Sequence, residues 1–219
     1  MVDLRLYALL DPERAGGHDL AALGRQVVAG GATLVQLRDK HGSTRRLIEE
    51  TRAIKVALGP SRVPVLVNDR VDVALAAGAD GVHVGQTDMP AADARRLLGP
   101  SAVIGLSIKT LAEAEAAPLE LLDYVCIGGV FVTTSKDNVA APIGIAGLKT
   151  ILARLRARAP DFPMGAIARI DETNAGEVVA AGADGVAVIS ALSLAPDPAG
   201  AARRLRDIID RSLHARGGG

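Results

Sequence analysis

The stretch GADGVHVGQTD, residues 78–88, begins with the same five letters as GADGVAVIS, residues 182–190. In each copy a glycine follows a helical run, where it supplies the left-handed residue of a tight turn. A short Val-containing run typical of a buried strand comes next. Weaker copies occur at 31–37 (GATLVQL) and 123–127 (DYVCI). The residues that correspond just before these strands are Thr33, Asp80, Asp123 and Asp184. The repeated letters therefore indicate a repeated turn and strand.

Short apolar runs alternate with longer amphipathic runs along the whole chain, which predicts an α/β fold. The predicted strands are 4–10, 33–37, 65–68, 81–84, 103–106, 124–128, 164–167 and 185–188. The predicted helices are 20–29, 44–58, 71–77, 91–98, 111–117, 145–157, 172–180 and 198–213. Eight strand–helix units in 219 residues predict a single (β/α)₈ TIM barrel over residues 1–213, and we expect a disordered tail over 214–219. An open doubly wound sheet is the alternative, because alternation alone does not show closure.

Side chains alternate along a strand, so the corresponding strands present two sets of residues. We expect the first set to pack against the helices: Val35, Val82, Val125 and Val186. The second set then faces the barrel axis: Gln36, His83, Cys126 and Ala187. Toward the C-terminal end of the barrel the same direction holds Arg38, Gly85, Gly128 and Ile189, and the two glycines leave room for a ligand.

Composition excludes several classes of function. The chain carries 25 basic and 25 acidic residues, which gives no general attraction to nucleic acid or to an anionic membrane. Aromatic residues are only 2%, too few for base-stacking platforms. One cysteine excludes an internal disulfide and fits a reducing compartment. Neither a signal peptide nor a membrane span is predicted, so we expect a cytoplasmic protein. The helix faces leave room for a homo-oligomer.

Polar residues gather where the predicted strands end, which is the end of a TIM barrel that carries the active site. The candidates are Gln36, Leu37, Arg38, Asp39, Lys40, Asn68, Asp69, Asp88, Ser107, Thr133, Thr134, Ser135, Lys136, Ile189 and Ser190. Arg38, Lys40 and Lys136 converge there only if an anion compensates their charge, and both side-chain types suit phosphate oxygens. Asp69 and Asp88 suit Mg²⁺, which takes one or two carboxylates together with substrate phosphates. The set predicts a site for a diphosphate leaving group.

Each candidate also has a simpler interpretation. Asp69 and Asp88 both precede predicted helices and suit N-caps. Lys40 alone is typical of a solvated surface lysine, and 133–135 alone of a polar loop. His83 is expected to line the wall of the site and not to act as a base. The hydroxyls of 133–135 and the amides near Ser190 suit a second phosphate.

The stretches 36–40 (QLRDK), 67–88 (VNDRVDVALAAGADGVHVGQTD), 105–110 (GLSIKT), 133–136 (TTSK) and 182–192 (GADGVAVISAL) together resemble the thiamine phosphate synthase family. The resemblance runs from about Leu6 to Leu192. It implies that hydroxymethylpyrimidine pyrophosphate and a thiazole phosphate join to give thiamine phosphate and pyrophosphate. It also implies that the C–O bond breaks first, giving a cation that the thiazole nitrogen captures. Such a step needs charge stabilisation more than a base.

The resemblance also implies a role for each matching position. Arg38, Lys40, Ser107 and Lys136 would carry catalysis and, with Gln36, Leu37, Asp39 and Asn68, would hold the pyrimidine pyrophosphate. Asp69 and Asp88 would bind Mg²⁺. Thr133, Thr134, Ser135, Ile189 and Ser190 would hold the thiazole phosphate.

Two stretches depart from the family's pattern. The loop resembling GPxFPT lacks both prolines, and the expected Ile-Gly-Gly-Ile is Ile167-Ala168-Arg169-Ile170. Arg169 would either crowd the thiazole phosphate or bind it. The departure leaves two alternatives: a thiazole phosphate tautomerase, which would not need the paired carboxylates, and a non-catalytic barrel that binds thiazole or thiamine phosphate.

Overall fold

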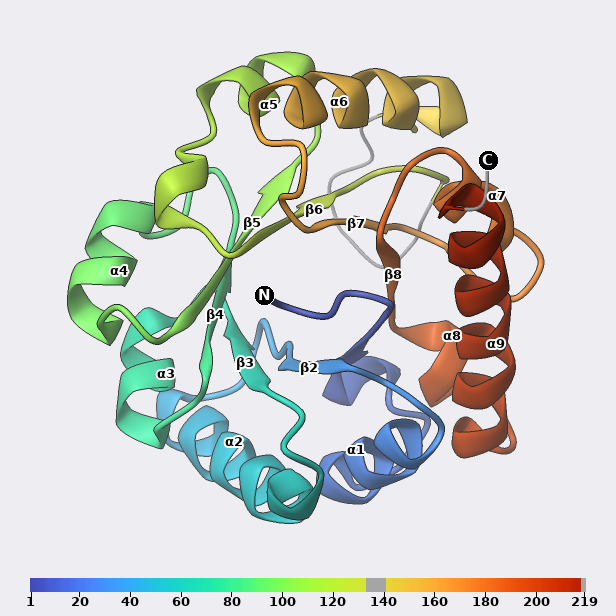
Figure 1. Cartoon of the computed structure of the whole chain (residues 1–219). Coiled ribbons are helices and arrows are strands. Elements are labelled where there is room, and N and C mark those ends of the chain that lie inside the picture. Colours follow the sequence, from blue (N-terminus) through green and yellow to red (C-terminus); the bar gives the residue numbers. More distant parts are fainter. Residues whose placement is uncertain (133–140, 218–219) are drawn as a thin grey trace.

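The computed structural model describes residues 1–132 and 141–217. Eight parallel strands form a closed barrel in chain order, and the helices surround it (Figure 1). β1 (Leu6–Leu10) pairs with β2 (Leu34–Leu37) on one side and with β8 (Gly185–Val188) on the other, which closes the sheet. The TIM barrel is therefore confirmed, and the open doubly wound alternative is excluded.

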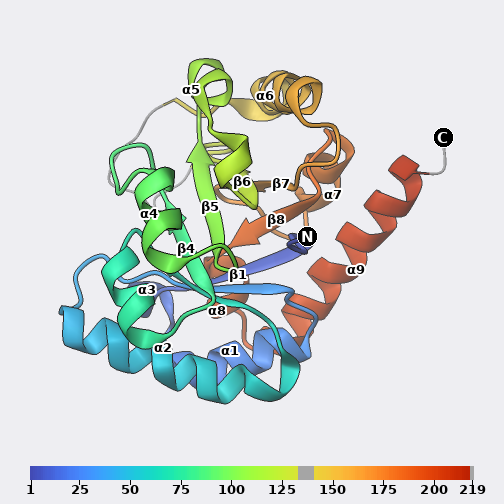
Figure 2. The same ribbon diagram turned by 60° about the vertical axis from the view of Figure 1, so that its left-hand side comes forward.

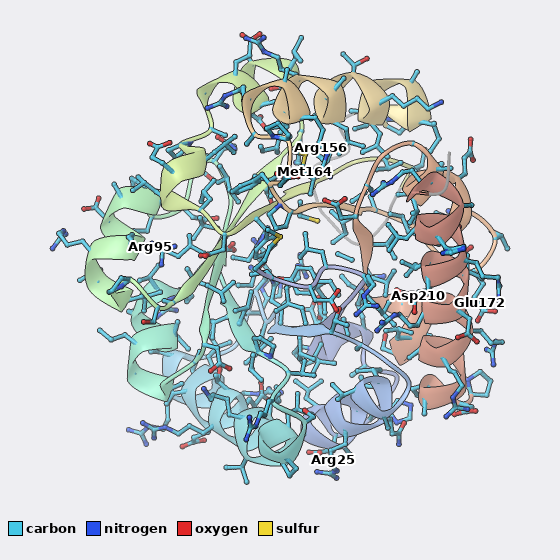
Figure 3. The ribbon with its side chains drawn as sticks, in the orientation of Figure 1. Arg25, Arg95, Arg156, Met164, Glu172 and Asp210 are labelled. Atoms are coloured by element: carbon cyan, nitrogen blue, oxygen red, sulfur yellow. The ribbon has the colours of Figure 1, made fainter. Side chains whose placement is uncertain are left out.

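The remaining elements alternate between the barrel wall and the outer layer. The other strands are β3 (Val65–Asn68), β4 (Gly81–Val84), β5 (Val103–Ile108), β6 (Tyr124–Ile127) and β7 (Met164–Ile167). The helices are α1 (Leu20–Ala29), α2 (Thr44–Leu58), α3 (Val71–Ala77), α4 (Ala91–Leu98), α5 (Leu111–Ala116), α6 (Gly144–Arg158), α7 (Ala175–Ala180), α8 (Ser190–Ser193) and α9 (Pro198–Gly217). Short 3₁₀ turns lie at Pro12–Arg14, Gly59–Ser61 and Leu119–Leu121. Charged side chains such as Arg25 and Glu172 point outward from the ring of helices (Figure 3).

The strand register separates two apolar layers, as the alternation of side chains predicts. The four corresponding valines Val35, Val82, Val125 and Val186 lie in the layer between barrel and helices. Cys126 and Ala187 belong to a second cluster inside the barrel, and Gln36 and His83 line the cavity that opens from it. The predicted direction of both sets is confirmed.

The residue before each even-numbered strand ties the N-terminal end of the barrel together. Its side-chain oxygen accepts the backbone N–H near the start of the preceding strand. The four bonds are Leu6 N to Thr33 Oγ1 (3.2 Å), Val65 N to Asp80 Oδ2 (2.8 Å), Ile104 N to Asp123 Oδ2 (2.8 Å) and Met164 N to Asp184 Oδ2 (2.9 Å). Each aspartate also pairs with a cation from an even-numbered helix: Lys55, Arg95 or Arg156. The sequence repeat is thus a structural clamp.

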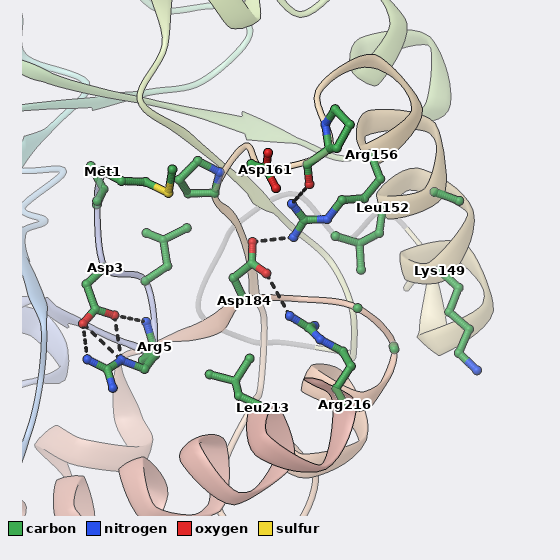
Figure 4. Close-up of a pocket in the computed structure, with 17 residues that line it drawn as sticks. Met1, Asp3, Arg5, Lys149, Leu152, Arg156, Asp161, Asp184, Leu213 and Arg216 are labelled. Atoms are coloured by element: carbon green, nitrogen blue, oxygen red, sulfur yellow. Dashed lines mark hydrogen bonds and ion pairs between the residues drawn. The ribbon is translucent and has the colours of Figure 1, made fainter. Parts of the chain in front are cut away.

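Asp184 is the most heavily bonded of these aspartates. Arg156 and Arg216 reach it from α6 and α9, at 2.5 and 2.9 Å, on one side of a cleft of about 840 Å³ (Figure 4). Arg156 also donates to the backbone carbonyls of Pro160 and Phe162. Arg216 donates to those of Val179 and Ala183. Because this cleft lies at the N-terminal end of the strands, its bonds serve stability.

Several boundaries differ from the sequence prediction by one to four residues, and those of α9 and α7 differ most. The tail was expected to be disordered from His214, but α9 continues to Gly217, and Arg216 anchors its last turn. α7 begins at Ala175, because Asp171 instead accepts the Thr173 N–H in a turn. α9 packs against α1 and α7 and completes the ring of helices (Figure 2). No helix among the described residues is long and apolar enough to cross a membrane.

Candidate active site

A cavity of about 740 Å³ opens at the C-terminal ends of the strands. All eight strands or the loops that follow them contribute to its lining. The predicted site residues in the lining are Gln36, Arg38, Asn68, Ser107, Ile189 and Ser190. Lys40 and Asp69 form an ion pair beside the end of β3, next to Asn68. Thr133, Thr134, Ser135 and Lys136 lie outside the described residues.

Two residues of the QLRDK stretch point elsewhere. Leu37 is fully buried in the layer between barrel and helices, since alternation turns it away from Gln36 and Arg38. The Asp39 carboxylate accepts the N–H groups of His41 and Gly42, at 2.9 and 2.7 Å, and shapes the loop after β2. Neither residue lines the cavity, so a contact of Leu37 or Asp39 with substrate, which stays a prediction, would come from the backbone.

Arg38 is held by a carboxylate that the sequence prediction missed. Arg38 is only 8% exposed, and its guanidinium forms an ion pair with Asp11, which is 2% exposed. Asp11 directly follows β1, so its position at a strand end was the signal that could have identified it. A buried charge needs such a partner. Asp11 therefore fixes the position of the guanidinium at the cavity.

The two predicted metal ligands lie together. Lys40 Nζ lies 2.8 Å from Asp69 Oδ2, and Asp88 Oδ2 accepts the Gly85 N–H at 2.7 Å. Burial raises the pKa of the Asp69 carboxyl above its usual range; Lys40 opposes this rise, and the adjacent Asp88 carboxylate adds to it. Neither aspartate caps a helix, because the N-cap positions of α3 and α4 are Arg70 and Pro90. The alternative interpretation as caps is therefore wrong.

Asp69 also has an unusual backbone. Its φ is +61°, in the left-handed region, and the Arg70 N–H donates to the Asn68 carbonyl across it at 2.7 Å. This tight turn is costly for a residue other than glycine, although aspartate tolerates it better than most. Such strain is typical of functional positions, where the surrounding structure maintains it.

These carboxylates fit a Mg²⁺ ion whose remaining coordination positions would be filled by substrate oxygens. Residues 1–132 and 141–217 contain no cluster of three or more His, Cys, Asp or Glu side chains able to hold a metal by themselves. Mg²⁺ is usually bound by one or two carboxylates, with water and phosphate oxygens filling the other positions. The half-buried carboxylate pair, whose mutual repulsion a dication would relieve, matches this pattern.

A hydrogen-bonded chain crosses the floor of the cavity. Gln36 Nε2 donates to Tyr7 Oη, which lies 2.8 Å from Tyr124 Oη. His83 continues the chain, with Nδ1 2.8 Å from Tyr124 Oη and Nε2 2.9 Å from Ser107 Oγ. Burial raises the pKa of both tyrosine hydroxyls well above the usual range, so both are neutral. Sequence reasoning missed these tyrosines. They are the only two in the chain and both lie on predicted strands, which was the signal that could have identified them.

The end of β7 carries the departure from the family's glycine pair. Ala168 has a φ of 109° and Arg169 a φ of 51°, so both keep a backbone that favours glycine. Asn174 Nδ2 donates to the Arg169 carbonyl at 3.0 Å, and the Phe131 N–H donates to the Ala168 carbonyl at 3.4 Å. Arg169 lines the cavity, is exposed, and forms no ion pair within the described part of the chain.

A closed parallel barrel with cations and paired carboxylates at its C-terminal end defines a TIM-barrel enzyme that handles phosphorylated substrates. A family model described as thiamine monophosphate synthase matches residues 6–192. The thiamine-phosphate synthases of Agrobacterium fabrum and Chloroflexus aurantiacus are 53% and 46% identical to the chain. These alignments cover 98% of both chains in the first case, and 95% of this chain and 94% of the relative in the second.

A solved structure of thiamine phosphate pyrophosphorylase from Pyrococcus furiosus superposes with a TM-score of 0.83 at 36% identity, over 97% of this chain and 98% of that one. The chain belongs to the thiamine monophosphate synthase family. The family, the transferase class and the synthase activity predicted from the sequence are confirmed.

Proposed function

We propose that the chain joins hydroxymethylpyrimidine pyrophosphate to a thiazole phosphate in the cytoplasm, with Mg²⁺, and releases pyrophosphate. The observation that carries the proposal is the contact of Lys40 with Asp69, next to Asp88 and beside the cavity. The site thus offers cation and carboxylate together, as a metal-bound diphosphate requires. The single cysteine supports a reducing compartment.

The diphosphate end of the first substrate belongs at the ends of β2 and β3. Arg38 presents a guanidinium fixed by Asp11, while Lys40 is half-exposed and free to turn from Asp69 to a phosphate oxygen. Asp69 and Asp88 hold Mg²⁺, which when bound neutralises charge on the departing diphosphate. Asn68 adds an amide on the same side of the cavity. Lys136 is proposed as a further cation.

The pyrimidine ring belongs on the floor, between Gln36 and Ser107. A Ser–His contact such as Ser107–His83 can also indicate a hydrolase. Here the other imidazole nitrogen contacts a neutral tyrosine hydroxyl, whereas the base of such a triad contacts a carboxylate. The pair is therefore suited to hydrogen bonding. This agrees with a dissociative step, in which the ring cation forms without a protein nucleophile.

The thiazole phosphate belongs on the opposite side, at the ends of β7 and β8. Ile189 and Ser190 line the cavity there, and Arg169 lies beside them in the lining. Arg169 offers a cation where the family pattern has glycine. Thr133, Thr134 and Ser135 are proposed as additional contacts to this phosphate.

A pyrophosphate-release assay with both substrates and Mg²⁺ tests the proposal. Wild type should turn over, and the double variant Asp69→Ala/Asp88→Ala should lose activity by at least about 100-fold, the scale expected when transition-state charge is left unstabilised. The matched control is Asp93→Ala/Asp207→Ala, which removes two carboxylates from outer helices and should leave turnover unchanged. Full activity of the Asp69/Asp88 variant would refute the metal site. Isomerisation of the thiazole without Mg²⁺ would instead support the tautomerase alternative.

A further inference from the structure

The hydrogen-bonded chain on the cavity floor has a direction. One end is Gln36, which is 1% exposed, and the other is Ser107, which faces the cavity. The members between them are Tyr7, Tyr124 and His83, whose heavy-atom separations from Tyr7 onward are 2.8, 2.8 and 2.9 Å. Each hydroxyl has one hydrogen to donate, and a buried O–H that finds no acceptor is costly, so the donor at one end sets the direction of the bonds that follow.

The direction follows from the Gln36 amide. Its Nε2 group only donates, so Tyr7 accepts from it. The hydrogen of the buried Tyr7 hydroxyl then needs an acceptor, and among the described residues Tyr124 Oη is the remaining partner, so Tyr7 donates to Tyr124. Tyr124 must then donate to His83 Nδ1, which requires a bare nitrogen there and a hydrogen on Nε2. That hydrogen points at Ser107 Oγ, so the serine accepts from His83 and its own O–H remains for a ligand.

The opposite direction would change what the ligand meets. With the amide turned, Tyr7 would donate to Gln36, His83 would carry its hydrogen on Nδ1, and Ser107 would donate to His83 Nε2. The serine would then present only lone pairs to the cavity, which repel an anion. Gln36 Oε1 has no partner within residues 1–132 and 141–217, although it is buried. In the first direction this oxygen is left to accept from a ligand, such as a ring amine.

We propose that Tyr7, Tyr124 and His83 are positioning residues that hold His83 as the Nε2–H tautomer, so that the Ser107 hydroxyl donates to the anionic leaving group. The inference rests on the proposed function, which supplies a diphosphate as that group. A donor aimed at developing negative charge stabilises the transition state more than the ground state. The hydrogen-bonded chain therefore affects kcat through Ser107, although Tyr7, Tyr124 and His83 do not touch the diphosphate.

The tautomer can be measured directly. In the ¹⁵N-labelled free protein at neutral pH, imidazole nitrogen shifts should show His83 with a hydrogen on Nε2 and a bare Nδ1. The chain has four histidines, so the signal is assigned by its loss in His83→Gln. An Nδ1–H tautomer would overturn the proposal. This measurement needs no activity, so it separates a failure of this inference from a failure of the proposed function, which wild type without pyrophosphate release would reveal.

A double-mutant cycle tests the coupling. Ser107→Ala and Tyr124→Phe should each lower kcat by about 10-fold or more, with the KM for the pyrimidine substrate changed by less than about twofold. Because Tyr124 acts through Ser107, the double variant should be no slower than Ser107→Ala alone. Multiplied losses would show that the tyrosine acts independently, which would overturn the proposal.

Two histidine variants separate positioning from packing. The amide nitrogen of His83→Gln reaches the place of Nε2 and still donates to Ser107, so kcat should be largely retained. His83→Asn places its amide near Nδ1 and should lose kcat to the level of Ser107→Ala. Thr51→Val is the control for a buried hydroxyl, since Thr51 lies on α2 and donates to the Leu47 carbonyl. Equal loss in both histidine variants, with melting temperatures like wild type, would refute the proposal.

Discussion

Lys40 Nζ lies 2.8 Å from Asp69 Oδ2, so one ion pair joins the proposed diphosphate cation to the proposed metal ligand. The Lys40 side chain is 48% exposed and that of Asp69 is 21% exposed. Lys40 is therefore well hydrated and exchanges partners at low cost, whereas Asp69 is the partner that suffers from burial. In the free protein Lys40 thus partly neutralises the Asp69 carboxylate, and a substrate phosphate can replace Asp69 as the partner of Lys40.

We expect Asp69→Asn to raise the stability of the metal-free protein while abolishing its response to Mg²⁺. Asparagine removes a charge that burial and Asp88 disfavour, and it tolerates a φ of +61°. A gain of about 1 kcal/mol corresponds to a rise in Tm of about 2–4 °C for a chain of this size. Thermal melts with and without Mg²⁺ and pyrophosphate measure both effects. An undiminished Mg²⁺-dependent shift in the variant would contradict the assignment of Asp69 as a ligand.

Asp11→Ala should destabilise the fold by about 3–5 kcal/mol, because it leaves the Arg38 guanidinium buried without its carboxylate. Urea unfolding measures this change. The double variant Asp11→Ala/Arg38→Met should recover much of the stability, since no buried charge is left unpaired, but not the activity. If the double variant is as unstable as Asp11→Ala, the loss comes from packing or from the turn at Glu13, whose N–H Asp11 accepts.

Ala168→Gly should stabilise the protein by about 1 kcal/mol, because glycine adopts a φ of 109° without strain from a β-carbon. The matched control is Ala166→Gly, two residues earlier in β7, where the side chain is fully buried and the backbone is that of a strand. There glycine should destabilise by a similar amount. Equal destabilisation by both changes would show that the backbone at 168 is not strained.

Arg169→Gly should raise the KM for the thiazole phosphate by about 10-fold, the loss of one charge-assisted contact. The reason is that Arg169 lines the cavity with no carboxylate partner in the described part of the chain. The KM of Arg169→Lys for the thiazole phosphate should lie between those of wild type and Arg169→Gly. The KM for the pyrimidine substrate should not change in either variant. A lower KM in Arg169→Gly would show that the guanidinium obstructs the phosphate.

Asp184→Ala should lower the free energy of unfolding by about 2 kcal/mol and leave kcat unchanged at temperatures where the protein is folded. It removes the acceptor of the Met164 N–H and the partner of Arg156 and Arg216, at the barrel end opposite the active site. Asp80→Ala, which loses one cation, Lys55, and one backbone bond, should cost less. Loss of kcat in folded Asp184→Ala would contradict the separation of stability from catalysis.

The strands could be predicted from the sequence because residues that are neighbours along the chain determine them. Val82 and His83 alternate in a run too short for a helix, and Gly78 with a φ of +66° ends α3 as its position predicts. The same alternation correctly placed Gln36 inside the barrel. Applied to every residue of QLRDK, it would also have turned Leu37 away from the cavity. The resemblance covers the whole stretch, and a contact of Leu37 with substrate through its backbone stays a prediction.

What the sequence by itself determined is the order of elements, the face of each strand and the residues at each strand end, since all depend on neighbours along the chain. Only the tertiary structure decided which side chains meet: Asp11 with Arg38, 27 positions apart, and Tyr7 with Tyr124, 117 apart. Closure of the barrel sets these contacts, because the pairing register of eight strands fixes which side chains share a layer. GADGV could therefore be read from the sequence as a turn and a strand, but its aspartates became a clamp only when the preceding strand supplied an N–H.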